Sequence, residues 1–233
     1  MKGYNVKNEN EEKYIKLAYN EDYKRCYTPW EPRIMKPDHR FIWALERTAG
    51  KNILDYGCGD GIFLSLCAGN NLRPSGYDIS EEALSIAKAK LQNKAVLYNN
   101  LKDIQNNYFD NVSCFEVLEH VDKPHEIMME LFKKCKDKGR ILITVPIENR
   151  IPDIMHKQRF NYYDMFELVS RFTYDFNIYL LNKFRKTGQN INLFGIIAIK
   201  HKGYRYNQNK TTEENLRNRK VDDIFKILVK QKN

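Results

Sequence analysis

The chain has 233 residues, a length that suits one α/β domain with additions at its ends rather than two full domains. Its net charge of +9 favours an anionic partner such as RNA, a phosphorylated metabolite or an acidic lipid surface, and most of the excess lies in residues 200–233. No apolar run approaches the ~20 residues of a membrane span, no apolar signal segment opens the chain, and the scattered cysteines lack C-x-x-C spacing. These features exclude a transmembrane or disulfide-scaffold protein and predict a cytoplasmic one.

Residues 1–48 read as an N-terminal extension that caps the rest of the chain. The pattern predicts short helices over 9–19 and 41–48, and the prolines of 28–37 interrupt regular structure between them. The domain proper then spans 49–202.

Residues 52–66, NILDYGCGDGIFLSL, combine a buried strand, a glycine-rich turn and a helix start. The strand is predicted over 52–56 and the helix over 61–69. Three glycines within five positions allow positive φ angles and remove side chains where a ligand would contact backbone. Free N–H groups at a helix start favour an anionic or polar ligand.

Strands and helices then alternate, which predicts a parallel sheet with its ligands beyond the carboxyl ends of the strands. The patterns place strands and helices as follows: strands over 74–79, 95–99, 110–116 and 139–145, and helices over 81–92 and 123–136. Asp78 closes the second strand, 17 positions after Gly61, where an acid can accept hydrogen bonds from two ribose hydroxyls.

Residues 146–174 interrupt the alternation of strands and helices and are predicted to form a lid, with a helix over 161–172. Two strands, 175–184 and 191–200, follow on either side of a hairpin turn at 187–190. A capping box at Thr211 and Glu214 begins a basic amphipathic helix within 203–233. That helix would dock on the body, pair with another subunit as a homodimer, or lie on a membrane surface.

Four ordered motifs resemble those of the class I S-adenosylmethionine (SAM) methyltransferases: DYGCGDG, GYDIS, the segment 110–121 and the segment 139–146. The resemblance covers roughly residues 50–200 and is strongest to the ubiquinone-biosynthesis O-methyltransferase branch. It implies a Rossmann-like α/β sandwich with a seven-stranded, mostly parallel sheet, an antiparallel last strand and a lid insertion. It also implies that Tyr27, Trp30 and Arg33 line the substrate pocket, although a surface wrap with aromatic anchors explains them as well.

The resemblance implies a SAM site at the strand ends. There the glycine turn binds the methionine part, the acid of the second motif binds the ribose, and further residues surround the adenine and the far side of the cofactor. The residues that would bind the cofactor are Asp55, Gly57, Gly59, Asp78, Ile79, Asn99, Asn100, Phe115 and Glu116. The family often has an acid near the adenine amine, and this chain offers Asn99 and Asn100 there instead.

The pattern Glu116-x-x-Glu119-His120 follows the fourth strand, near the expected methyl group. Three roles are open to it. His120 could be a general base, the three side chains could bind a divalent metal, or they could be structural. His156 lies in a lid segment that resembles one in the ubiquinone-type branch, where a histidine faces the acceptor. It is a second candidate base or metal ligand, and the alternative is a surface histidine in a polar loop without a role in the site.

The sequence thus predicts a SAM-dependent methyltransferase that acts on an oxygen of a small metabolite, a glycan or a cell-envelope sugar or lipid intermediate. The basic tail motivates a second hypothesis, an RNA 2′-O-methyltransferase, although no RNA-binding module is recognisable and a nucleic-acid partner is therefore disfavoured. A third hypothesis is a SAM-binding, non-catalytic subunit that serves a partner.

Overall fold

The computed structural model describes residues 39–147, 156–184 and 190–203. The helices are α2 (His39–Leu45), α3 (Ile62–Gly69), α4 (Glu81–Leu91), α5 (Pro124–Lys134) and α6 (Tyr162–Ser170), with short 3-10 turns η1 (Leu101–Asp103) and η2 (Leu118–His120). The strands are β1 (Asn52–Tyr56), β2 (Arg73–Tyr77), β3 (Val96–Tyr98), β4 (Phe109–Phe115), β5 (Cys135–Pro146), β6 (Phe176–Phe184) and β7 (Asn190–Ile199).

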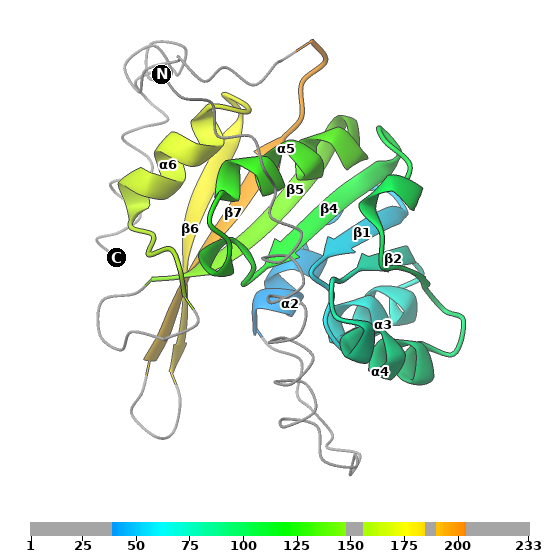
Figure 1. Ribbon diagram of the computed structural model, residues 1–233. Helices are drawn as coiled ribbons and strands as arrows, with labels where there is room; N and C mark the ends of the chain where they lie inside the picture. The colour runs from blue at the N-terminus through cyan, green and yellow to red at the C-terminus, as the bar shows by residue number, and fades with distance from the viewer. Residues whose placement is uncertain (1–38, 148–155, 185–189, 204–233) are drawn as a thin grey trace, which may run out of the picture.

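These strands form one sheet of seven in the order β3-β2-β1-β4-β5-β7-β6 (Figure 1). The first five in chain order pair in parallel, and β7 is antiparallel to both of its neighbours. Because β1 lies between β2 and β4, the chain reverses its winding direction at β1, and crevices at such a switch point are where open α/β sheets bind ligands. The predicted mostly parallel sheet with an antiparallel last strand is confirmed.

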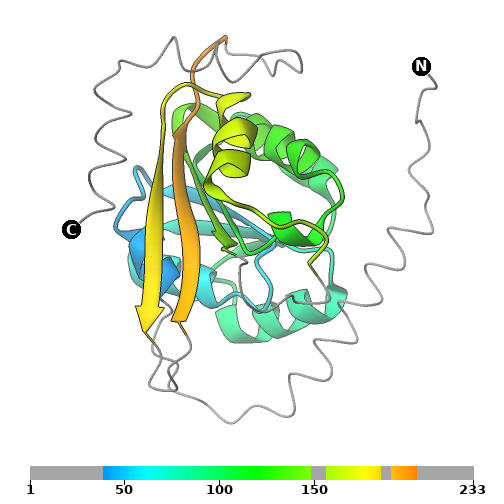
Figure 2. The ribbon, with the colours of Figure 1, turned by 90° about the vertical axis from the view of Figure 1, so that its left-hand side faces the viewer.

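Helices cover both faces of the sheet, as Figure 2 shows with α5 and α6 on one side and α2 on the other. Successive residues of β1 point to opposite faces, so Ile53 packs in the cluster under α2 and α3, and Leu54 packs in the cluster under α5 and α6. Both side chains are fully buried. This two-sided burial explains why the strand reads as a continuous apolar run instead of an alternating one.

The junction between α5 and β5 differs from the predicted one. The sequence predicts a helix to residue 136 and a strand from residue 139, whereas α5 ends at Lys134 and β5 begins directly at Cys135. Cys135 pairs with Phe109 in the sheet, and the register then shifts before Arg140 pairs with Asn111. Tertiary pairing therefore overrides the local helical preference of this stretch.

Lys134 is buried at this junction, and its ammonium group holds a neighbouring loop. The Nζ atom donates to the carbonyl oxygens of Leu101 and Ile104, at 2.9 and 2.7 Å, and to Oδ1 of Asn106 at 2.8 Å. Burial lowers the pKa of the Lys134 ammonium. The side chain thus ties the end of α5 to the connection between β3 and β4.

Replacing Lys134 by methionine should lower the free energy of unfolding by about 2 kcal/mol, because the buried carbonyl of Ile104 and the partly buried carbonyl of Leu101 lose their donor. Urea denaturation followed by circular dichroism measures the loss. Lys133→Met is the matched control: Lys133 is exposed and pairs with Glu130 at 3.1 Å, and such surface pairs contribute about 0.5 kcal/mol or less. Equal stability of the two variants would contradict the anchoring role.

Several predicted features lie outside the described residues. They are the helix over 9–19, the candidate pocket residues Tyr27, Trp30 and Arg33, residues 187–189 of the turn predicted at 187–190, and the tail helix that begins at Thr211. The helix predicted over 161–172 is present as α6, with the Asn161–Asp164 capping box formed as expected. Within the described ranges no helix has the length and apolar character that crossing a membrane requires.

Candidate active site

The glycine turn after β1 is held close to the end of β2. The N–H groups of Gly57 and Cys58 both donate to the Tyr77 carbonyl, at 2.8 and 3.0 Å. Gly57 has a φ of 78°, and a Cβ atom at this position would lie 2.4 Å from a methyl carbon of Val117. Only glycine therefore fits both the backbone angle and the close approach of the segment that follows β4.

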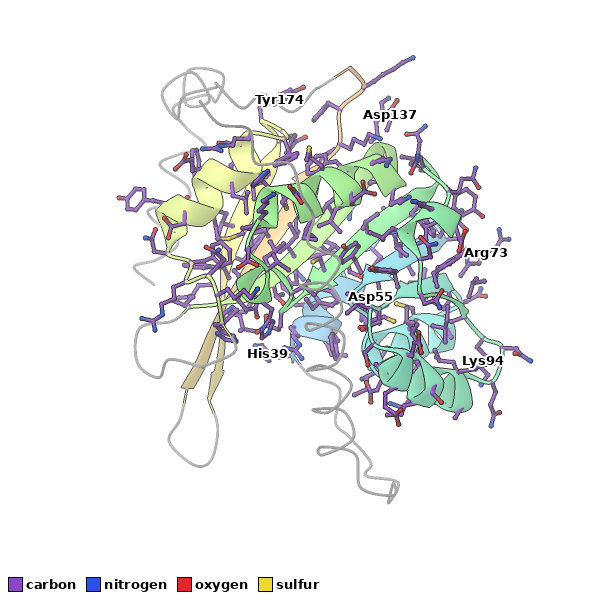
Figure 3. The ribbon with its side chains drawn as sticks, viewed as in Figure 1. His39, Asp55, Arg73, Lys94, Asp137 and Tyr174 are labelled. Carbon is purple, nitrogen blue, oxygen red and sulfur yellow. The ribbon has the colours of Figure 1, made fainter. Side chains whose placement is uncertain are left out.

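Two buried carboxylates flank this turn at the ends of neighbouring strands. Asp55 lies in β1, and its Oδ1 atom accepts a hydrogen bond of 2.7 Å from the Ser113 hydroxyl of β4. Burial, assisted by the charge of Asp78, raises the pKa of Asp55 to about 7, although the Ser113 hydrogen bond opposes the shift. Figure 3 shows Asp55 in the middle of the molecule, among elements from both halves of the domain.

Asp78 follows β2 and connects the glycine turn to the start of α4. Its Oδ2 atom accepts from the Gly59 N–H at 2.8 Å and its Oδ1 atom from the Ser80 N–H at 2.9 Å. Burial raises the pKa of Asp78, and these backbone hydrogen bonds counteract that effect. Each carboxylate oxygen has more than one lone pair, so both can accept a further hydrogen bond.

A cation lies at the same strand ends, contributed by α2. The Arg40 guanidinium is 3.8 Å from Oε2 of Glu116, and its charge lowers the pKa of Asp55 slightly against the effect of burial. The Glu116 Oε1 atom accepts a 2.8 Å hydrogen bond from the fully buried Thr144 hydroxyl. Glu116 itself has a φ of 53°, in the left-handed region, so the chain turns sharply where β4 ends.

Two histidines and an acid gather beside η2. The imidazole rings of His120 and His156 lie with their centroids 4.8 Å apart, and Nε2 of His120 is 3.8 Å from Oε1 of the buried Glu119. The possible ligand atoms of all three side chains fall within 4.8 Å of one another. Burial, together with the neighbouring His120, lowers the pKa of His156, which favours its neutral form.

The backbone fixes where His156 lies. The Glu119 carbonyl accepts two hydrogen bonds from the segment that follows His156, from the N–H groups of Lys157 at 2.7 Å and Gln158 at 2.9 Å. The Lys157 ammonium also pairs with Asp122 at 2.6 Å. The segment that begins at His156 is thereby attached to η2, and His156 is brought to His120 from 36 positions along the chain.

The remaining predicted cofactor residues are spread around this centre. Ile79 is half-buried after β2, and Asn99 and Asn100 are exposed beyond β3, where Asn100 caps η1 by accepting from the Lys102 N–H at 3.0 Å. Phe115 is buried in β4, with its ring 4.9 Å from that of Phe63. Glu116 faces Thr144 and Arg40 and is outside the cluster that the two histidines form with Glu119.

Sequence reasoning missed Arg40. It named His156 as a candidate base or ligand, but its metal set was Glu116, Glu119 and His120, whereas the structure groups His156 with Glu119 and His120. Arg40 has no motif around it, and its place depends on how α2 packs. The two histidines were both predicted as catalytic residues, and the structure brings them into contact.

Comparison with solved structures supports this fold. Magnesium protoporphyrin IX methyltransferase from Synechocystis, solved with bound SAM, matches 84% of the chain and 99% of its own length, with a TM-score of 0.58 and 16% identity. The [4+2]-cyclase SpnF matches 82% of the chain and 97% of its own length, with a TM-score of 0.63 and 14% identity. The predicted Rossmann-like class I methyltransferase sandwich is confirmed, and the cyclase shows that this fold does not determine a single chemistry.

Curated relatives point to the same branch as the sequence motifs. The ubiquinone biosynthesis O-methyltransferase of Thiobacillus denitrificans is 35% identical over 130 residues, which are 49% of this chain and 56% of the relative. The mitochondrial enzyme of that name from Schizosaccharomyces pombe is 35% identical over 104 residues, 41% of this chain and 38% of the relative. The chain spans about half the length of these curated relatives. The model of the family described as "Methyltransferase domain" matches residues 28–200, and the chain therefore belongs to this methyltransferase family.

Proposed function

We propose that this protein is a cytoplasmic SAM-dependent methyltransferase that transfers a methyl group to an oxygen of a small metabolite, a glycan or a cell-envelope sugar or lipid intermediate. The observation that carries the proposal is the pair of buried carboxylates, Asp55 and Asp78, at adjacent strand ends on either side of the glycine turn. SAM offers an ammonium group at its methionine end and a ribose diol, and each carboxylate has a matching partner there. Pairing of subunits through the terminal helices remains a prediction, since both segments lie outside the described residues.

Each polar group at the strand ends then has a role toward the cofactor. Ionised Asp55 accepts from the α-ammonium group of SAM, and the ribose hydroxyls donate to Asp78, whose carboxylate is already oriented by the Gly59 and Ser80 amides. The Arg40 guanidinium suits the α-carboxylate, because a planar cation can bind it with two hydrogen bonds. Glu116 orients that guanidinium from behind.

The histidine pair is positioned to activate the acceptor. Methyl transfer from a sulfonium to a hydroxyl requires an in-line approach and a group that takes the hydroxyl proton. His156 has a lowered pKa and is therefore neutral and able to accept a proton, and His120 lies against its ring. We assign His156 as the base and His120 as the residue that fixes its orientation.

The same cluster also fits a divalent cation. One buried carboxylate and two imidazoles form a donor set that transition metals accept, and the ligand atoms lie within 4.8 Å of one another. Glu119, His120 and His156 would hold the ion, and Glu116, which the sequence pattern included, would remain with Thr144. When bound, such an ion would acidify an acceptor hydroxyl.

Removal of metal ions by a chelator distinguishes direct action of the two histidines from binding of a divalent ion by the cluster. Turnover measured after dialysis against EDTA should persist if the histidines act directly. Loss of turnover that one divalent ion restores would assign the cluster to a metal, and a Glu119→Gln variant that no longer responds to the ion would identify the ligand set.

Replacing Asp78 by alanine should weaken SAM binding at least about tenfold, because the ribose hydroxyls lose a charged acceptor and the Gly59 amide loses its partner. Isothermal titration calorimetry with SAM measures the effect. Asp103→Ala is the control, because Asp103 is an exposed acid in η1. An unchanged affinity of the Asp78 variant would refute the ribose assignment.

The acceptor class can be found by incubating the protein with methyl-labelled SAM and a lysate separated into small-molecule, lipid, glycan and RNA fractions. Label in a small-molecule, lipid or glycan fraction supports the proposal and supplies an acceptor to purify. Label in RNA alone would replace it with the 2′-O-methyltransferase hypothesis. SAM binding without any transfer would favour the non-catalytic subunit.

A further inference from the structure

A pocket lies at the opposite end of the sheet from the candidate active site. It has a volume of about 500 Å³, and its lining consists of Asp137, Lys138, Tyr174, His201, Lys202 and Gly203. These residues come from the start of β5, the connection before β6 and the end of β7, whereas the glycine turn and Asp55 lie at the carboxyl end of β1. Figure 3 shows Tyr174 and Asp137 together at one end of the molecule, away from Asp55 and His39.

An aromatic stack forms one side of this pocket. The rings of Tyr174 and His201 are stacked with centroids 4.5 Å apart and an interplanar angle of 20°. Both nitrogens of His201 are engaged, Nδ1 with the Tyr174 hydroxyl at 3.3 Å and Nε2 with Asp175 at 3.2 Å. Tyr174 nevertheless keeps 46% of its surface exposed, which leaves ring surface for a planar ligand to stack on.

The backbone on both sides of Tyr174 is firmly held. The Thr173 side chain is fully buried, and its hydroxyl donates to the Ile199 carbonyl at 2.7 Å. The Asp175 N–H donates to the Thr173 hydroxyl at 3.1 Å, and the Ile199 N–H donates to the Asp175 carbonyl at 2.8 Å. Tyr174 is therefore presented by a rigid frame, which lowers the entropic cost of stacking a ligand on it.

The charges of the pocket favour an anion. Both nearby acids already have polar partners, because Asp137 is 3.9 Å from the Lys200 ammonium and Oδ2 of Asp175 lies 3.2 Å from Nε2 of His201. The exposed Lys138 and Lys202 have no ion-pair partner among the described residues. Lys138 is also fixed in a left-handed backbone conformation, and its N–H donates to the Lys200 carbonyl at 2.8 Å. Two available ammonium groups thus lie on the same pocket as an exposed aromatic ring.

We propose that this pocket binds one nucleotide unit of a single-stranded nucleic acid, with the base stacked on Tyr174 and the phosphate near Lys138 and Lys202. A ring that stacks any base beside lysines that contact phosphate is the combination that single-strand binding surfaces use. Residues 200–233 carry six more basic than acidic residues, and this sequence continues directly from the pocket lining at Gly203. That excess of charge favours a polymer over a free nucleotide.

Fluorescence anisotropy with the full chain and a labelled ten-nucleotide single-stranded RNA tests the proposal. A parallel titration with AMP shows whether the pocket binds a free nucleotide or a nucleotide within a polymer. Tyr174→Ala should weaken RNA binding about tenfold, while Tyr174→Phe, which keeps the stacking face, should bind within about twofold of the wild type. Lys138→Ala and Lys202→Ala should each reduce the slope of log affinity against log salt by about 0.7.

Two matched controls account for non-specific effects. Tyr163→Ala removes an 80% exposed tyrosine from α6 that does not line the pocket, and Lys94→Ala removes an exposed lysine that Figure 3 shows at a distance from Tyr174. Both should leave the Tyr174-dependent part of binding intact. Saturable AMP binding that is lost in Tyr174→Ala would support the pocket with a free nucleotide as its source. RNA binding that does not differ between wild type and Tyr174→Ala, with no AMP binding, would overturn the proposal.

Discussion

Replacing His156 by alanine is expected to lower kcat for methyl transfer at least about 100-fold, the usual contribution of a positioned general base. The neutral imidazole of His156 lies against His120 and is the group that takes the acceptor proton in the proposed mechanism. His120→Ala should also lower kcat, because His156 would lose the ring that fixes its orientation. Single-turnover rates at saturating SAM, with the acceptor found by fractionation, measure the chemical step.

The affinity of these variants for SAM separates chemistry from binding. Both should bind SAM as the wild type does, since the glycine turn and the two strand-end acids are untouched. His125→Ala is the matched control, because His125 lies in the first turn of α5 and outside the cluster. Full turnover by the His156 variant would remove that residue from the mechanism, and a loss of SAM affinity would show that it supports the cofactor site instead.

The affinity of the free protein for SAM should fall about tenfold for each pH unit below 7, because each unit makes the ionised form of Asp55 about tenfold rarer. Burial raises the pKa of this carboxyl to about 7 in the ligand-free protein, and the cofactor ammonium requires the ionised form. Calorimetric titrations at pH 5, 6, 7 and 8 follow the change. Asp55→Asn should bind weakly at every pH and show no such slope.

Asp55 also links the site to folding stability. The carboxyl has a higher pKa in the folded protein than the ordinary value of about 3.9 in an unfolded chain. Between about pH 4 and pH 7 the folded state therefore binds more protons, and the stability contributed by this group is present at low pH and decreases as the pH rises. At pH 8 the Asp55→Asn variant should consequently melt at a higher temperature than the wild type. A lower melting temperature would contradict the desolvation of Asp55.

Much of the fold follows from local sequence patterns. The apolar run of β1 followed by glycines, and the cap at Ser80 before α4, are determined by residues that are neighbours in the chain, and these elements lie close to where they were predicted. The Ser80 hydroxyl accepts from the Ala83 N–H at 3.1 Å, as an N-cap should. The strand-end placement of Asp55 and Asp78 follows in the same way, because the carboxyl ends of parallel strands share one edge.

Features that depend on distant contacts could not be predicted. The shift of the α5–β5 boundary to Cys135 requires knowledge of its partner Phe109 across the sheet. The hydrogen bonds that the Glu119 carbonyl accepts from Lys157 and Gln158 likewise join residues that are far apart in the chain. Arg40 reaches the site because it lies on the same face of α2 as Trp43 and Ala44, three and four positions further on, which are buried against the rest of the domain. No periodicity in the sequence contains this information.

The double hydrogen bond at the Glu119 carbonyl has a consequence for protein engineering. Lys157 and Gln158 hold the predicted lid segment through their N–H groups, which every amino acid except proline supplies. A library that varies positions 157 and 158 can therefore change the charge and shape beside the two histidines without moving them. The two side-chain contacts to Asp122 are exposed and would be lost in such variants, but the main-chain hydrogen bonds would remain, so acceptor preference can diverge by side-chain replacement while these bonds still hold His156 beside His120.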